Sequence, residues 1–117
     1  MRYAFLLYYD EAASPAPGSP ELQERVAAYG AFTEEVQNSG AWQAGEALQP
    51  TATATVVRAG SNGSPVTTDG PFAETKEQLG GFYILDCANL DEAVELAAKI
   101  PAAQHGSVEV RPIWEVR

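Results

Sequence analysis

The stretch at residues 2–9, RYAFLLYY, limits the possible folds most, because it reads as a β-strand that is apolar on both faces. Side chains alternate between the two faces of a strand, so one face carries Tyr3, Phe5, Leu7 and Tyr9 and the other carries Ala4, Leu6 and Tyr8. A strand of this kind has to be covered on both sides. In a small domain, helices cover one side, so the other side predicts contact with a second copy of the chain.

Two helices are predicted from their start signals and their apolar spacing. The first begins at Ser19-Pro20, a cap followed by proline in the first turn, and ends at Gly40. The second begins at Asn89, with Glu92 placed to close a capping box, and ends at Pro101. The stripes expected to face the core are Leu22, Val26, Tyr29, Phe32 and Val36 in the first helix, and Leu90, Ala93, Val94, Ala97 and Ile100 in the second.

Five further stretches read as strands. Residues 41–47 form a short one with Trp42, Ala44 and Glu46 on one face, and residues 51–58 alternate threonine with apolar residues. The turn at residues 60–63 predicts a hairpin that returns over residues 66–69. Residues 82–87 are apolar on both faces, and residues 107–113 form the last strand after a loop at 102–106.

The order of these elements predicts one domain over residues 1–117, an α+β ferredoxin-like sandwich of βαβ-hairpin-βαβ type. Right-handed crossovers place both helices on one face of the sheet. The other face would show Tyr8 or Leu7, Trp42, and Tyr83 or Ile84 to water. Because an apolar face of that extent is normally an interface, we expect a homodimer that closes into a dimeric α/β-barrel with a cleft at its rim.

Charge and cysteine content narrow the function classes. The net charge of −9 offers no basic patch for phosphates, so we expect no direct contact with nucleic acid or an anionic membrane. The longest apolar run is far shorter than the roughly 20 residues of a membrane span. Cys87 is the single cysteine and reads as a small buried hydrophobe rather than a reactive thiol. A cytoplasmic location is expected.

The densest polar chemistry follows the turn Asp69-Gly70-Pro71-Phe72. One interpretation is a structural turn with Phe72 as its hydrophobic anchor, and the other is a rigid turn that holds Asp69 at the rim of the cleft as a general base or a ligand acceptor. Glu74 and Lys76 are either a solvated connector or side chains that reach into the cleft or across to the partner subunit. The glycine pair at 80–81 indicates a bulge or a close approach to a ligand.

His105 is the single histidine, and it is either incidental or a proton-transfer residue near neutral pH. On the strands, Arg111 is expected to pair with Glu109 or Glu46, or these groups form a polar floor to the cleft. No ligand set with metal spacing exists, so no metal site is predicted. No phosphate-binding glycine loop, serine elbow or dinucleotide fingerprint exists either, so no cofactor is predicted.

The nine residues from Asp69 to Glu77, DGPFAETKE, resemble the stretch that defines the DGPF-domain branch of the YCII-related family. The flanking stretches GEALQP at 45–50 and GSVEVRPI at 106–113 agree with it, and the resemblance covers essentially the whole chain. It implies a dimeric α/β-barrel and a suspected enzymatic role for a histidine and an aspartate, for which His105 and Asp69 are the candidates. It also implies a link to sigma factors, which some relatives are fused to or encoded beside.

Three functional hypotheses follow. The first is a small-molecule-binding or catalytic barrel with Asp69 and His105 as catalytic residues and Tyr8, Glu46, Glu74 and Lys76 as ligand-binding residues. The second is a regulatory accessory that contacts a sigma factor through its acidic surface. The third is a purely structural dimer module, in which the motif only builds the fold.

Overall fold

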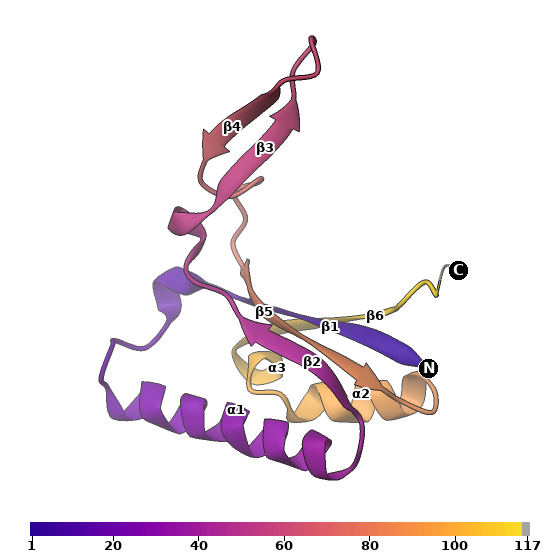
Figure 1. Ribbon diagram of the computed structural model, residues 1–117. Coiled ribbons are helices and arrows are strands. Elements are labelled where there is room, and N and C mark those ends of the chain that lie inside the picture. The colour runs from indigo at the N-terminus through magenta and orange to yellow at the C-terminus, as the bar shows by residue number, and fades with distance from the viewer. Residues whose placement is uncertain (116–117) are drawn as a thin grey trace.

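The computed structural model describes residues 1–115 and has an α+β architecture built on one antiparallel sheet (Figure 1). The sheet has the strand order β2-β5-β1-β6, and a separate two-stranded sheet pairs β3 with β4. The strands are β1 (Arg2–Tyr9), β2 (Trp42–Ala47), β3 (Thr55–Ala59), β4 (Pro65–Asp69), β5 (Gln78–Asp86) and β6 (Gly106–Pro112). The helices are α1 (Pro20–Asn38), α2 (Leu90–Lys99) and α3 (Ala102–His105), and the short 3-10 turns are η1 (Glu11–Ala13) and η2 (Thr51–Thr53).

The central position of β1 explains its two apolar faces. It pairs antiparallel with β5 on one side and with β6 on the other. Tyr3, Phe5 and Leu7 are buried beneath the helices, whereas Ala4, Leu6 and Tyr8 on the opposite face stay partly exposed. The register places Leu6 opposite Phe82 of β5, and Ala4 opposite Ile84. Ala4, Leu6, Tyr8, Phe82 and Ile84 therefore form the apolar part of the sheet face without helices, called here the open sheet face.

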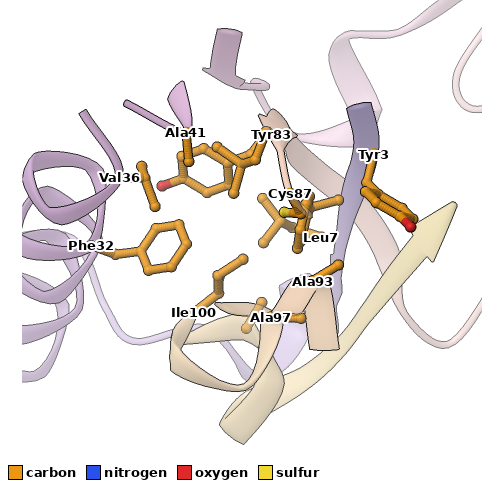
Figure 2. Close-up of a cluster of buried hydrophobic side chains, with 13 residues drawn as sticks. Tyr3, Leu7, Phe32, Val36, Ala41, Tyr83, Cys87, Ala93, Ala97 and Ile100 are labelled. Carbon is orange, nitrogen blue, oxygen red and sulfur yellow. The ribbon is translucent and has the colours of Figure 1, made fainter. Parts of the chain in front are cut away.

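All three helices lie on the other face, as the crossover rule predicts (Figure 1). The predicted caps are confirmed: the Leu22 amide donates to Ser19 Oγ at 3.2 Å, and the Glu92 amide donates to Asn89 Oδ1 at 2.9 Å. Figure 2 shows Phe32 and Val36 of α1 directed toward the cluster that contains Leu7 and Tyr83.

Several boundaries and faces differ from the sequence predictions. The expected loop at 102–106 is wrong, since α3 occupies Ala102–His105. The strand expected over 51–58 is divided into η2 and β3, and β5 begins at Gln78, four residues earlier than predicted. In the helix stripes, Val26, Leu90 and Val94 are more than half exposed, so those stripes face the core over only part of their length.

Trp42 lies on the helix face of the sheet, not on the open face where alternation predicted it. The register of β2 against β5 shifts between Trp42 and Ala44, which adds one residue to β2 and changes the phase of the alternation. The Trp42 ring packs edge-on against Tyr83, with ring centroids 6.1 Å apart. For the face without helices, the sequence left open the choice between Tyr8 and Leu7 and between Tyr83 and Ile84. The structure places Tyr8 and Ile84 on that face, while Leu7 and Tyr83 are buried.

Cys87 is buried, as predicted, and burial raises the pKa of its thiol. No helix within residues 1–115 has the length and apolar character needed to cross a membrane.

Candidate functional site

A cavity of about 450 Å³ lies between α1 and the helix-facing side of the sheet. The cavity exists because only the C-terminal half of α1 packs against the sheet, through Phe32 and Val36. The N-terminal half leaves Leu22 and Val26 of the predicted stripe lining an open space instead of a closed core. The walls combine apolar and aromatic side chains with the polar residues Arg25, Thr33 and His105.

Three tyrosines, Tyr9, Tyr29 and Tyr83, line this cavity and come from β1, α1 and β5. Tyr83 is held by an edge-to-face contact with Phe32, with centroids 5.2 Å apart, and its hydroxyl is 3.2 Å from Thr33 Oγ1. The Tyr9 ring lies over Gly80, where a Cβ atom would collide with it. The same glycine sits at a register shift between β1 and β5, so the bulge interpretation of the glycine pair is confirmed.

The Tyr29 hydroxyl has its pKa raised to about 12, chiefly by burial and further by the neighbouring Tyr9 and Tyr83. A backbone hydrogen bond from Ala102 opposes this rise in part. Tyr29 therefore stays neutral across the physiological range and presents a phenolic O–H donor in a partly desolvated wall of the cavity.

The raised pKa of Tyr29 predicts a specific loss of stability in alkali. An unfolded tyrosine ionises near pH 10, while Tyr29 in the folded chain keeps its proton to about pH 12. The folded state then binds more protons than the unfolded state, so this contribution is complete below about pH 10 and is lost as the pH rises toward 12. In urea titrations at several pH values, the free energy of unfolding of Tyr29→Phe should fall less steeply above about pH 10 than that of the wild type. Parallel slopes would contradict a buried Tyr29 hydroxyl.

His105 ends α3 and lines both this cavity and a smaller adjoining pocket that also contacts Glu21, Glu24 and Arg25. Its side chain is exposed, so it can exchange protons with solvent and with a molecule at the cavity mouth. Within residues 1–115, no three side chains of the histidine, cysteine, aspartate or glutamate types gather where a metal ion could be held.

Glu46 borders the cavity from the β2 edge of the sheet. The neighbouring Gly45 faces Trp42 and Tyr83, so strand alternation turns the Glu46 side chain toward the open sheet face. Tyr8 also lies on the open face, with its hydroxyl 3.5 Å from Glu109 Oε1. Arg111 forms its ion pair with Glu109, which selects one of the two predicted partners. Both side chains of that pair are well exposed, so it contributes little to stability.

Asp69, Glu74 and Lys76 lie outside the cavity. Asp69 ends β4, and the other two follow in the loop that leads to β5; all three side chains are exposed. Gly70 has φ +92°, a left-handed conformation that favours glycine, so the turn geometry depends on that residue. Phe72 is 74% exposed and lies against Arg58, 5.0 Å from the guanidinium carbon to the ring centroid. The interpretation of Phe72 as the hydrophobic anchor of the turn is therefore wrong, since its ring is largely exposed.

The sequence candidates thus divide among three regions of the structure. His105 lies at the cavity on the helix side, while Tyr8 and Glu46 lie on the open sheet face and Asp69, Glu74 and Lys76 lie on or beside the hairpin. Sequence reasoning missed Arg25 and the three tyrosines, because aromatic residues at helical or strand spacing read as core. One sequence feature could have indicated this site. Arg25 precedes Tyr29 by four residues, so a helix places its positive charge beside the apolar stripe.

Comparison with known proteins shows similarity to one family and to individual proteins. A family model described as the YCII-related domain matches residues 1–117. An uncharacterised protein of Rhizobium meliloti (strain 1021) is 41% identical over 115 residues, covering 97% of this chain and 92% of that protein. A solved structure of 5-chloro-2-hydroxyhydroquinone dehydrochlorinase (TftG) from Burkholderia phenoliruptrix AC1100, in complex with 2,5-dihydroxybenzoquinone, superimposes with a TM-score of 0.54 at 16% identity. That superposition covers 97% of this chain and 94% of the dehydrochlorinase and indicates a shared fold.

Proposed function

This chain belongs to the YCII-related family, and from that premise we propose that it binds a small ring-shaped organic molecule in the cavity beneath α1 and acts on it by acid–base chemistry. The observation that carries the proposal is the cavity itself. Its volume of about 450 Å³ falls within the range of small-molecule sites, and its walls are mainly apolar with a few convergent polar groups.

The polar groups of the cavity suit a ring that bears hydroxyl or carbonyl oxygens. Tyr29 supplies a neutral phenolic donor, and the hydroxyl pair of Tyr83 and Thr33 supplies a second polar point on the wall. Arg25 adds a positive charge that favours an anionic oxygen on the ligand. The dehydrochlorinase of similar fold was solved with a dihydroxylated quinone, which supports a ligand of this class.

In this proposal His105 transfers the proton. Histidine is the side chain whose ordinary titration range lies near neutral pH, and His105 lines the cavity while remaining open to solvent. Removal of a proton from a ring hydroxyl would leave an oxyanion, which Arg25 and the phenolic donor of Tyr29 would stabilise.

The proposal includes a homodimer formed through the open sheet face, closing into an α/β-barrel. Ala4, Leu6, Tyr8, Phe82 and Ile84 give that face a continuous apolar centre on β1 and β5, without a helix over it (Figure 1). Contact between two such faces would remove this surface from water. Asp69, Glu74 and Lys76 then remain candidates for a role at the boundary between the two subunits.

The binding experiment uses Trp42 as a reporter inside the cavity. Trp114→Phe removes the second tryptophan, which is 88% exposed, and leaves Trp42 as the only indole. 2,5-Dihydroxybenzoquinone and hydroquinone are titrated as probes, with cyclohexanol as the non-aromatic control. We expect saturable quenching by the aromatic and quinonoid probes only.

A matched pair of variants tests whether the ligand binds in this cavity. Val26→Phe fills the mouth of the cavity, whereas Val94→Phe makes the same change on α2 outside it, and the two valines are 63% and 53% exposed. Loss of ligand contacts should weaken binding about tenfold or more in Val26→Phe and leave Val94→Phe unchanged. Equal affinities in both variants would exclude this cavity. His105→Gln should keep binding but shift the pH dependence of any ligand deprotonation, which is followed by the visible absorbance of the quinone.

A further inference from the structure

The hairpin formed by β3 and β4 stands away from the rest of the chain. Figure 1 shows it rising from the sheet on the side opposite the three helices. Every residue of β4 is exposed, and Val56 is the one residue of β3 that is not. The radius of gyration of 16.3 Å exceeds the value of about 13 Å expected for a compact domain of this length. Residues 55–72, which comprise the hairpin and its following turn, are called here the arm.

The base of the arm is fixed to the body by a small set of contacts. The Glu11 carboxylate accepts hydrogen bonds from the amide and the hydroxyl of Thr51, both at 3.0 Å, and the Glu11 amide donates to Gln78 Oε1 at 2.8 Å. The Gly70 amide donates to the Ala54 carbonyl at 2.7 Å and closes the base. The arm therefore leaves the body in a defined direction.

An isolated two-stranded hairpin is marginally stable in water and needs a packing surface. One face of this hairpin carries Val56, Val66 and Arg58, because the register pairs Val56 with Thr68 and Arg58 with Val66. Arg58 also lies over the Phe72 ring, so Phe72 belongs to the same face. Val66 is 52% exposed and Phe72 is 74% exposed, so this apolar face has no cover within the described chain.

We propose that the arm clasps a second copy of this chain, with Val66 and Phe72 packed against the partner beside the paired open sheet faces. The inference rests on the dimer described under the proposed function and extends it from the sheet to the hairpin. Two observations select a second copy as the occupant. The arm rises on the same side as the open sheet face, so a second copy bound to that face would contact the arm (Figure 1).

The second observation is charge. The chain has a net charge of −9, but Arg58 and Asp69 are the only charged residues of the arm, so its own net charge is zero. Because the arm is neutral, it can approach a second, strongly acidic copy without added electrostatic repulsion. An arm that recognised a basic partner would be expected to carry a negative charge instead. The clasp also carries the turn with Asp69, and the adjoining Glu74 and Lys76, to the boundary with the partner.

Hydrogen exchange and sedimentation test the clasp. In the wild type, amide exchange across residues 55–69 should slow as the protein concentration rises through the dimer range. Val66→Asp should raise the dimer Kd about tenfold or more and restore fast exchange there. Val94→Asp is the matched control, since Val94 is 53% exposed on α2, and it should change neither quantity.

A third variant, Leu6→Asp, separates the clasp from the sheet interface. If Leu6→Asp dissociates the dimer while Val66→Asp does not, and if the arm exchanges at one rate at every concentration, the clasp is overturned and the sheet interface stands. A monomer in which the arm is already protected would overturn both. Neither result alters quinone binding in the cavity, so the ligand proposal is judged separately.

Discussion

Phe5→Ala is expected to lower the free energy of unfolding by about 3–5 kcal/mol, the largest effect of any substitution considered for this chain. Phe5 is fully buried at the centre of β1 and packs beneath the helices. Its removal takes a large aromatic surface out of the core and leaves a cavity that the surrounding strands cannot close. Urea denaturation followed by circular dichroism measures the loss.

The adjacent Leu6 is the matched control, because it lies on the open sheet face of the same strand. In dilute solution Leu6→Ala should cost only about 1 kcal/mol, since its side chain is partly exposed before the change. In the proposed homodimer the cost should grow at higher concentration, because dimer formation would stabilise the folded state by mass action. Equal costs at Phe5 and Leu6 in dilute solution would contradict the assignment of the two faces.

Gly106→Ala is expected to cost about 1–3 kcal/mol, although it adds a single methyl group. Gly106 lies opposite Tyr9 where β6 meets β1, and a Cβ atom there would collide with the Tyr8 carbonyl and lie 2.9 Å from Tyr9 Cα. Backbone atoms cannot rotate away as the end of a side chain can, so the start of β6 has to move. Since His105 is the preceding residue, the same change should also shift the pH dependence of 2,5-dihydroxybenzoquinone deprotonation.

Gly30→Ala is the control for that prediction. Gly30 lies within α1, and a Cβ atom there would meet no neighbouring atom within 4 Å. Alanine in a helix interior should stabilise the chain by about 0.5–1 kcal/mol because it has less backbone freedom to lose on folding. Thermal denaturation of the two variants checks the opposite signs, and a neutral Gly106→Ala would contradict the close β1–β6 approach.

The accuracy of the sequence predictions depended on how local each determinant was. The caps at Ser19 and Asn89 were predicted correctly because a cap is decided by the residue itself and its next turn. The face of Trp42 was predicted wrongly because one extra residue in β2 reverses the alternation, and that shift arises from pairing with β5. Phe72 was predicted as an anchor because its hydrophobicity was visible, whereas its exposure was not.

The candidate site was harder to predict than the fold. His105 was found because it is the one histidine, but Tyr9, Tyr29 and Tyr83 are far apart in the chain and each resembles a core residue. They line one cavity only because the N-terminal half of α1 is not packed against the sheet. A pattern within a short stretch of sequence cannot indicate that a helix and a sheet leave a cavity between them.

By itself, the sequence determined the order of the strands and of the two longer helices, the two apolar faces of β1 and the family, since these follow from spacing and contiguous motifs. Only the tertiary structure decided that His105 lies at a cavity with three tyrosines while Asp69 stands on an arm away from it. The physical reason is that a side chain's partners depend on long-range pairing and helix packing, which bring distant residues together or keep them apart.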